Sequence, residues 1–168
     1  MIMKKTEPQV RQKANLGDWL VISQGRSYGS RGYATRVRNL ADVMLDTYER
    51  RTVLIVDRIT GEEEVPSNVQ AIVLLASETG DHPDVLAHVS VRARNLKVLL
   101  CVLFDQEKCN QLAALENKHI FLQSITSDDV KYEIQSPHQA LTRKASSHLI
   151  LKTAIENAAD IREPPAIS

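Results

Sequence analysis

Residues 98–104 read Val-Leu-Leu-Cys-Val-Leu-Phe, an apolar run without a single charged side chain. Two similar runs precede it in the chain, Val-Leu-Ile-Val at 53–56 and Ala-Ile-Val-Leu-Leu at 71–75. A strand with one face in water alternates apolar and polar residues, whereas a strand covered on both faces is continuously apolar. The three runs therefore predict strands that are covered on both faces.

Weaker strand patterns lie on both sides of these runs. Tyr33, Thr35 and Val37 occupy alternate positions, as in a half-exposed strand. The Gly/Ser-rich stretch 24–32, which holds three of the six glycines, comes just before them. We expect further strands at 19–22, 120–122 and 127–134.

Helix-like spacing of apolar residues occurs between the strands and at the end of the chain. The sequence predicts a short amphipathic helix or turn at 40–49, a loop followed by about two helical turns at 84–95, a helix at 110–117 and a longer one at 139–161. Strands interleaved with helices indicate a compact α/β domain. We expect a flexible N-terminal segment at 1–17, the domain at 18–135 and a C-terminal helix or linker at 136–168.

Composition excludes several classes of protein. The chain has 168 residues, with 21 Lys+Arg against 21 Asp+Glu, which suits one domain. A net charge of zero argues against a nucleic-acid partner, which requires a basic surplus, and no apolar run approaches the roughly 20 residues of a membrane span. No signal or transit peptide is readable, which leaves both the cytoplasm and the plastid open. Cys101 and Cys109 lack metal-ligand spacing, so no metal site is predicted.

The common catalytic signatures are absent from the sequence. There is no GxxxxGK[ST] loop and no GxGxxG after a strand, so the chain has no recognisable nucleotide cradle. GxSxG and HExxH are also missing. Three adjacent carboxylates, Glu62 to Glu64, follow the turn-like Thr60-Gly61, and we expect them to lie in a solvated loop.

The segment 84–95, Asp-Val-Leu-Ala-His-Val-Ser-Val-Arg-Ala-Arg-Asn, carries the most chemistry. His88 opens the predicted helix, where unpaired amide N–H groups and the positive dipole end favour a phosphoryl anion. The same dipole disfavours a cationic imidazole, and a neutral imidazole is a nucleophile. Arg92 lies one turn further on the same face. The alternative from chemistry alone is a capping histidine beside two solvated arginines. The remaining histidines have no clustered partners and are expected to be structural or solvated: His82, His119, His138 and His148.

At this point the sequence resembles the phosphohistidine domain of alpha-glucan water dikinase. The resemblance rests on His-Val-Ser-Val-Arg-Ala-Arg-Asn at 88–95, Gly-Glu-Glu-Glu-Val-Pro at 61–66 and the runs at 71–75 and 97–105, and it covers about 19–134. More distantly, the chain is similar to the carrier domains of pyruvate phosphate dikinase and the phosphoenolpyruvate-using phosphotransferases. In those domains an arginine follows the histidine by six positions, which here is Arg94.

The resemblance implies a swivelling β/β/α phosphohistidine domain in a dikinase. ATP and Mg²⁺ would be bound by a separate ATP-grasp domain, without which the chain is expected to be inactive. His88 matches the catalytic carrier residue, which takes the β-phosphoryl of ATP and passes it to a glucosyl hydroxyl of an alpha-glucan, while the γ-phosphoryl goes to water. For phosphate binding, helical spacing favours Arg92 and the wider family favours Arg94, so both are kept, the second preferred. Ser90 is a further candidate phosphate donor.

The chain departs from the family pattern just before the histidine. Ala87 stands where a hydroxyl residue is usual, and Leu86 where distant relatives often have threonine. A lost hydroxyl removes one candidate hydrogen bond to the phosphoryl group, worth roughly 0.5–1.5 kcal/mol. The loop 77–84 also looks longer than the pattern. Two alternatives stay open: the carrier domain of a pyruvate phosphate dikinase-like enzyme, and a non-catalytic interaction module with a degenerate carrier fold.

Overall fold

The computed structural model describes residues 17–76 and 81–136. Contacts between Cα atoms divide the chain into a unit Met1–Ile134 and a unit Gln135–Ser168, and the second lies almost wholly beyond the described residues. The helix predicted at 139–161 and nearly all of the predicted flexible segment at 1–17 fall outside the described residues. The predicted domain boundaries therefore stay predictions.

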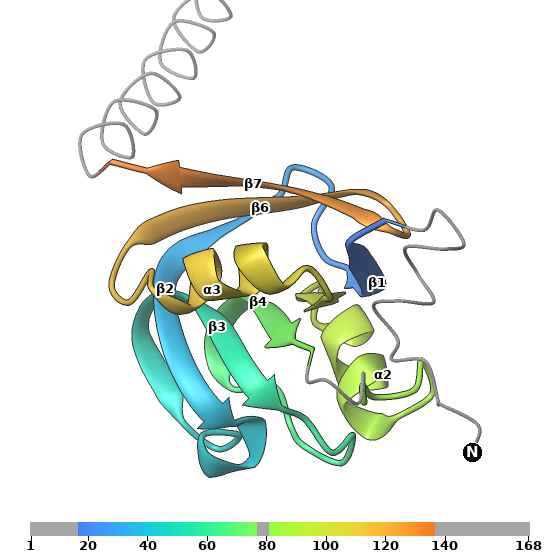
Figure 1. Cartoon of the computed structure of the whole chain (residues 1–168). Helices are drawn as coiled ribbons and strands as arrows, with labels where there is room; N and C mark the ends of the chain where they lie inside the picture. The colour runs from blue at the N-terminus through green and yellow to red at the C-terminus, as the bar shows by residue number, and fades with distance from the viewer. Residues whose placement is uncertain (1–16, 77–80, 137–168) are drawn as a thin grey trace, which may run out of the picture. The chain divides into compact units, whose positions relative to one another are not determined.

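Strands dominate the part of the chain that the structure describes (Figure 1). Seven of them form one sheet in the order β1-β5-β4-β3-β2-β6-β7. Their bounds are β1 Trp19–Gln24, β2 Ser30–Asn39, β3 Thr47–Arg58, β4 Ser67–Leu75, β5 Leu99–Leu103, β6 His119–Thr126 and β7 Asp129–Gln135. The helices are the 3-10 turn η1 (Leu40–Asp42), α2 (His88–Asn95) and α3 (Gln106–Ala113). The predicted α/β class is confirmed in this coarse form, a mixed fold with more strand than helix.

The three continuous apolar runs are the neighbouring strands β3, β4 and β5. β2, β3, β4 and β5 pair in parallel, with Val53 opposite Ala71 and Ile72 opposite Leu100, whereas β1 and β6 add to the two sides antiparallel. A parallel connection must cross back over the sheet, and α2 lies in the connection from β4 to β5. This crossover places α2 beside the sheet.

The sheet curls until its two ends almost meet. The N–H of Val21 in β1 donates to the carbonyl of Ser127 at 2.8 Å, and the Ser124 hydroxyl of β6 donates to the carbonyl of Gln24 at 3.0 Å. A Cβ on Gly17 would lie 2.0 Å from the carbonyl oxygen of Asp128, so only glycine fits this close approach. The result is a barrel-like sheet that is nearly closed.

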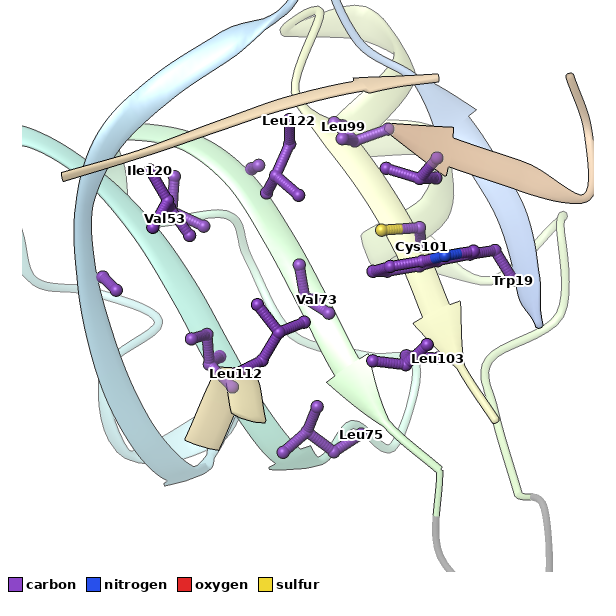
Figure 2. Packing of buried hydrophobic residues seen from close by; sticks show 14 of the residues in the cluster. Trp19, Val53, Val73, Leu75, Leu99, Cys101, Leu103, Leu112, Ile120 and Leu122 are labelled. Carbon is purple, nitrogen blue, oxygen red and sulfur yellow. The ribbon is translucent and has the colours of Figure 1, made fainter. Parts of the chain in front are cut away.

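Each central strand buries both of its faces, as the apolar runs predict. Alternate residues of β3 belong to two separate hydrophobic clusters. Val53 and Ile55 pack in an inner cluster on one face of the sheet, and Leu54 and Val56 pack in an outer cluster on the other face. The inner cluster lies within the curl and draws on all seven strands and α3, with Trp19, Leu112 and Leu122 among its members (Figure 2). The outer cluster includes Val89 and Ala93 of α2, both fully buried, so packing against the sheet holds this helix in place.

Two helices differ from the sequence prediction. The amphipathic helix or turn expected at 40–49 is only the short η1, because β3 already begins at Thr47 and pairs with β4. The helix expected at 110–117 is α3, which begins at Gln106. Its N-cap is Asp105, whose side chain accepts the N–H of Lys108 at 2.8 Å. The capping aspartate, directly after the β5 run, is the signal that the spacing of apolar residues missed.

Candidate functional site

His88 is the first residue of α2, as the sequence predicts, and a turn centred on Asp84 leads into it. The carbonyl of Asp84 accepts the N–H of Ala87 at 3.0 Å and the Ser90 hydroxyl at 2.7 Å, and its carboxylate accepts the N–H of Leu86 at 2.8 Å. The N-cap residue, Ala87, has no side chain able to cap the helix. Asp84, three residues before the N-cap Ala87, therefore stabilises the turn that leads into α2.

The first amide groups of α2 are largely used within the protein. The N–H of Val89 donates to the carbonyl of Gly61 at 2.9 Å, and those of Ser90 and Val91 donate to the carbonyl of Ala87 at 3.0 and 3.1 Å. The expectation that this helix end presents unpaired N–H groups to a phosphoryl anion is therefore wrong for these three amides.

The loop between β3 and β4 is anchored by a buried carboxylate. Glu63 is 2% exposed, and it accepts the N–H of Thr60 at 2.7 Å, the Thr60 hydroxyl at 2.9 Å and the N–H of Gly61 at 2.7 Å. Burial by itself raises the pKa of Glu63, but the hydrogen bonds from Thr60 and Gly61 outweigh it, and the pKa is lowered overall. The expectation of a solvated loop for all three carboxylates is wrong, because Glu63 folds back into its own turn.

Glu64 joins His88 to Arg92. Its Oε1 lies 2.5 Å from Nε2 of His88, and its Oε2 accepts Nε–H of Arg92 at 2.8 Å. All three side chains keep contact with solvent, at 38% exposure for Glu64, 44% for His88 and 43% for Arg92. One carboxylate thus connects a potential nucleophile to a cation one helical turn away.

The hydrogen bonds from His88 and then Arg92 hold the pKa of the Glu64 carboxyl below its ordinary value. An ionised carboxylate has no proton to donate, so Nε2 of His88 is the donor in this pair. The charge of Glu64 is balanced by the guanidinium of Arg92. An anion can bind to Arg92 next to a ring nitrogen of His88 only when the Glu64 carboxylate moves away from both side chains.

The other two residues predicted to bind phosphate face different partners. Nη2 of Arg94 donates to the carbonyl of Val85 at 2.5 Å, which ties the helix to the turn before it. Ser90 is fully buried, and its hydroxyl is committed to Asp84. The structure brings Arg92, and neither Arg94 nor Ser90, into the cluster with His88. Beside the cluster, Val85 and Leu86 are 53% and 80% exposed.

Comparison with known proteins decides the family. The family model described as "Alpha-glucan water dikinase, phosphohistidine-like domain" matches residues 18–141. The chain belongs to this family. Curated relatives agree: it is 38% identical over 133 residues to alpha-glucan water dikinase 1, chloroplastic, of Arabidopsis thaliana and 35% identical over 149 residues to alpha-glucan water dikinase, chloroplastic, of Solanum tuberosum.

These matches cover 79% and 89% of the chain but 9% of each relative, so the chain spans about a tenth of the length of those dikinases. The protein from Citrus reticulata named alpha-glucan water dikinase, chloroplastic, is 37% identical over 134 residues, which are 80% of the chain and 8% of that protein. No solved structure matches the chain. In these relatives, the phosphohistidine-like domain that the chain matches is one part of an enzyme.

The other two histidines that the structure describes have partners different from those of His88. Nδ1 of His82 lies 3.2 Å from the carbonyl oxygen of Pro83, and its ring packs edge-on against Phe104. The ring of His119 packs edge-on against Tyr33. His138 and His148 fall outside the described residues. Both described histidines therefore have structural contacts.

The part of the chain that the structure describes has neither a candidate metal site nor a helix that could span a membrane. No group of three or more His, Cys, Asp or Glu side chains at 17–76 and 81–136 could hold a metal ion. None of the helices in these ranges is long and apolar enough to cross a membrane. Cys101 and Cys109 are free thiols in the inner cluster, and burial raises the pKa of Cys109 to about 11.

The sequence did not predict Glu64 as the partner of His88. Glu64 lies 24 residues before the histidine, on a different connection of the sheet. The Gly-Glu-Glu-Glu-Val-Pro string at 61–66 was part of the resemblance, and this was the available signal. It marked the loop without showing which carboxylate faces the helix.

Proposed function

We propose that the chain is the phosphoryl carrier of an alpha-glucan water dikinase. In this proposal His88 accepts the β-phosphoryl group of ATP from an ATP-grasp domain, which also holds Mg²⁺, and passes it to a glucosyl hydroxyl of the glucan. The γ-phosphoryl goes to water. The domain swivels between the two sites, since one histidine must visit a nucleotide and then a polysaccharide.

One observation supports this proposal most strongly: a solvent-accessible histidine at the start of α2 shares a carboxylate with an arginine. His88 and Arg92 bind the two oxygens of Glu64 within the family match at 18–141. A carrier needs an exposed nucleophile and a cation that can hold the transferred group. A non-catalytic module would have no need of this cluster.

Arg92 is the side chain best placed to bind the phosphoryl group. Its guanidinium offers five N–H donors, a geometry suited to phosphate oxygens. The burial of Val89 and Ala93 holds α2 against the sheet, so the distance between His88 and Arg92 is set by a rigid helix. The chain then contributes the nucleophile and the anion partner, while the activation of ATP belongs to the partner domain.

Transfer from labelled ATP tests the carrier role. The full chain is mixed with an ATP-grasp domain of a glucan water dikinase, Mg²⁺ and ATP labelled at the β-phosphorus, and acid-labile label on the chain is counted. We expect label on the wild type and none on His88→Asn. His82→Asn is the matched control, because His82 lies outside the His88 cluster, and it should label like the wild type. Equal labelling of His88→Asn and wild type would refute the proposal.

The acceptor is tested with the labelled chain. Soluble glucan or pyruvate is added after ATP has been removed, and loss of label from the chain is compared with its gain by the acceptor. We expect transfer to glucan. Transfer to pyruvate alone would instead identify the chain as part of a pyruvate phosphate dikinase-like enzyme.

A further inference from the structure

We propose that Glu64 is a positioning residue that occupies the place of the phosphoryl group while His88 is unphosphorylated, and that it competes with this group for Nε2 and Arg92. The inference rests on the carrier role proposed above. In this view the Glu64 carboxylate positions His88 and Arg92 before the phosphoryl group arrives. When the carboxylate binds both side chains again, it favours release of the phosphoryl group to the acceptor.

The contacts of Glu64 are those that a phosphoryl group on His88 requires. One oxygen faces Nε2 of His88 at 2.5 Å and the other faces Nε of Arg92 at 2.8 Å. A phosphoryl group bound to Nε2 would meet the same guanidinium. A phosphoryl group on Nδ1 would not take the place of Glu64 between His88 and Arg92. The position of Arg92 therefore assigns the transfer to Nε2.

The backbone around Glu64 is held in place, so only its side chain can yield. The preceding residue, Glu63, is fixed by three hydrogen bonds, and the two that follow, Val65 and Pro66, are buried. The helix is tied to the same loop through Gly61 and Val89. Glu64 therefore remains close to His88 even when its carboxylate rotates away.

Transfer then exchanges one anion for another. Nε2 loses its proton to water and forms a bond to the β-phosphorus, and the phosphorus–oxygen bond to the departing AMP breaks. The bond between the β- and γ-phosphoryl groups also breaks, and a water molecule takes the γ-phosphoryl group as inorganic phosphate and releases a proton. In the hand-off, the acceptor oxygen bonds to phosphorus, the nitrogen–phosphorus bond breaks, the hydroxyl proton goes to water and Nε2 takes up a proton again. Throughout the phosphorylated state, the negative Glu64 lies beside a negative phosphoryl group, which it repels.

The competition predicts a change in the phosphorylation equilibrium of His88 that is not expected for a merely structural residue. Glu64→Gln keeps the size of the side chain and removes its charge, so the phosphorylated state loses a repulsion and the unphosphorylated state loses a charge-assisted pair. Phosphohistidine should therefore accumulate in this variant. A side chain that served only to orient His88 would alter the rate of labelling and leave the equilibrium unchanged.

The test brings the full chain to equilibrium with an ATP-grasp domain, Mg²⁺, β-labelled ATP, AMP and inorganic phosphate, without glucan. We expect the ratio of phosphorylated to free His88 to rise roughly tenfold in Glu64→Gln, the effect of losing one charge-assisted hydrogen bond. Glu62→Gln, the exposed neighbour on the same loop, should match the wild type. An unchanged or lower ratio in Glu64→Gln, or a phosphoryl group located on Nδ1 by NMR, would overturn the proposal.

A second measurement does not depend on the carrier role. Inorganic phosphate is titrated into the chain alone while the Nε–H resonance of Arg92 is followed by NMR. We expect phosphate to bind roughly tenfold more tightly to Glu64→Gln than to wild type, because it no longer has to displace a carboxylate. Equal affinities would refute the competition. Labelling results for wild type and His88→Asn separately decide the carrier role.

Discussion

The carbonyl oxygen of Gly61 accepts the N–H of Val89 at 2.9 Å. This backbone bond, together with the side-chain contacts of Glu64, joins the loop that carries Glu64 to the helix that carries His88, two segments on different connections of the sheet. Gly61 has a positive φ of 112°, and a Cβ at this position would lie 3.2 Å from that of Ala87. The position of the site therefore depends on a residue without a side chain.

Replacing Gly61 with alanine should destabilise the domain and displace Glu64. A φ of 112° is strained for any residue with a Cβ, and the close approach to Ala87 adds to the strain. We expect the free energy of unfolding to fall by about 1–3 kcal/mol. Urea denaturation measures the change, and Glu62→Ala on the same loop is the control with no expected loss. A Gly61→Ala variant as stable as wild type would contradict the observed conformation.

Replacing Glu63 with alanine should destabilise the domain. Glu63 is 2% exposed, and the substitution removes the acceptor of two N–H groups, that of the exposed Thr60 and that of the buried Gly61. We expect a loss of about 1–3 kcal/mol in the free energy of unfolding, the cost of leaving the buried Gly61 donor without an acceptor. Glu63→Gln, which retains one acceptor oxygen, should lie between alanine and wild type in the same denaturation series.

Glu63 should also make the domain sensitive to acid. Its pKa is lower in the folded protein than its ordinary value of 4.5, so the folded state binds the proton less readily than the unfolded state. The associated stability is present above the ordinary pKa and is lost as the pH falls through the folded one. The urea midpoint should fall more steeply for wild type than for Glu63→Gln between about pH 6 and pH 3, the range over which carboxyl groups titrate. Parallel curves would show that this carboxyl does not contribute.

The two arginines on α2 should have separable effects. Arg92→Gln removes the cation that shares Glu64 with His88, and we expect labelling of His88 to slow about 100-fold, as for the loss of one transition-state donor. Arg94→Gln loses its bond to the Val85 carbonyl and should label near the wild-type rate, with a stability loss of about 1 kcal/mol. The reverse order would support Arg94, the residue favoured by the wider family.

A hydroxyl at position 87 should add little stability to α2. Ala87 is the N-cap residue and has no side chain that could accept a hydrogen bond. The N–H groups that a capping side chain would bind, those of Val89 and Ser90, already donate to backbone carbonyls. We therefore expect Ala87→Ser to change the free energy of unfolding by less than about 0.5 kcal/mol. Ala87→Val is the control, because it adds bulk without an acceptor. Thermal unfolding of the three proteins distinguishes a capping gain from a packing effect.

The sequence anticipated the elements of the fold better than their arrangement. Continuous apolar runs predicted strands buried on both faces, and β3, β4 and β5 have this property because each of their faces packs in a separate cluster. The start of α2 at His88 was also predicted, from the loop with Pro83 and the polar residues that follow. The start of α3 lies four residues before the predicted one, because the spacing of apolar residues does not show the N-cap at Asp105.

Local pattern by itself predicted the helix that begins at His88 and, through helical spacing, placed Arg92 one turn further on the same face. His88 was singled out as the carrier residue by the family resemblance. Only the tertiary structure decided what faces them. Which of three adjacent carboxylates turns inward, and which reaches His88, depends on how the β3–β4 loop packs against α2. Contacts between residues 24 positions apart, on separate crossovers, leave no periodic trace in the sequence, so the role of Glu64 emerged only when the sheet brought the two connections together.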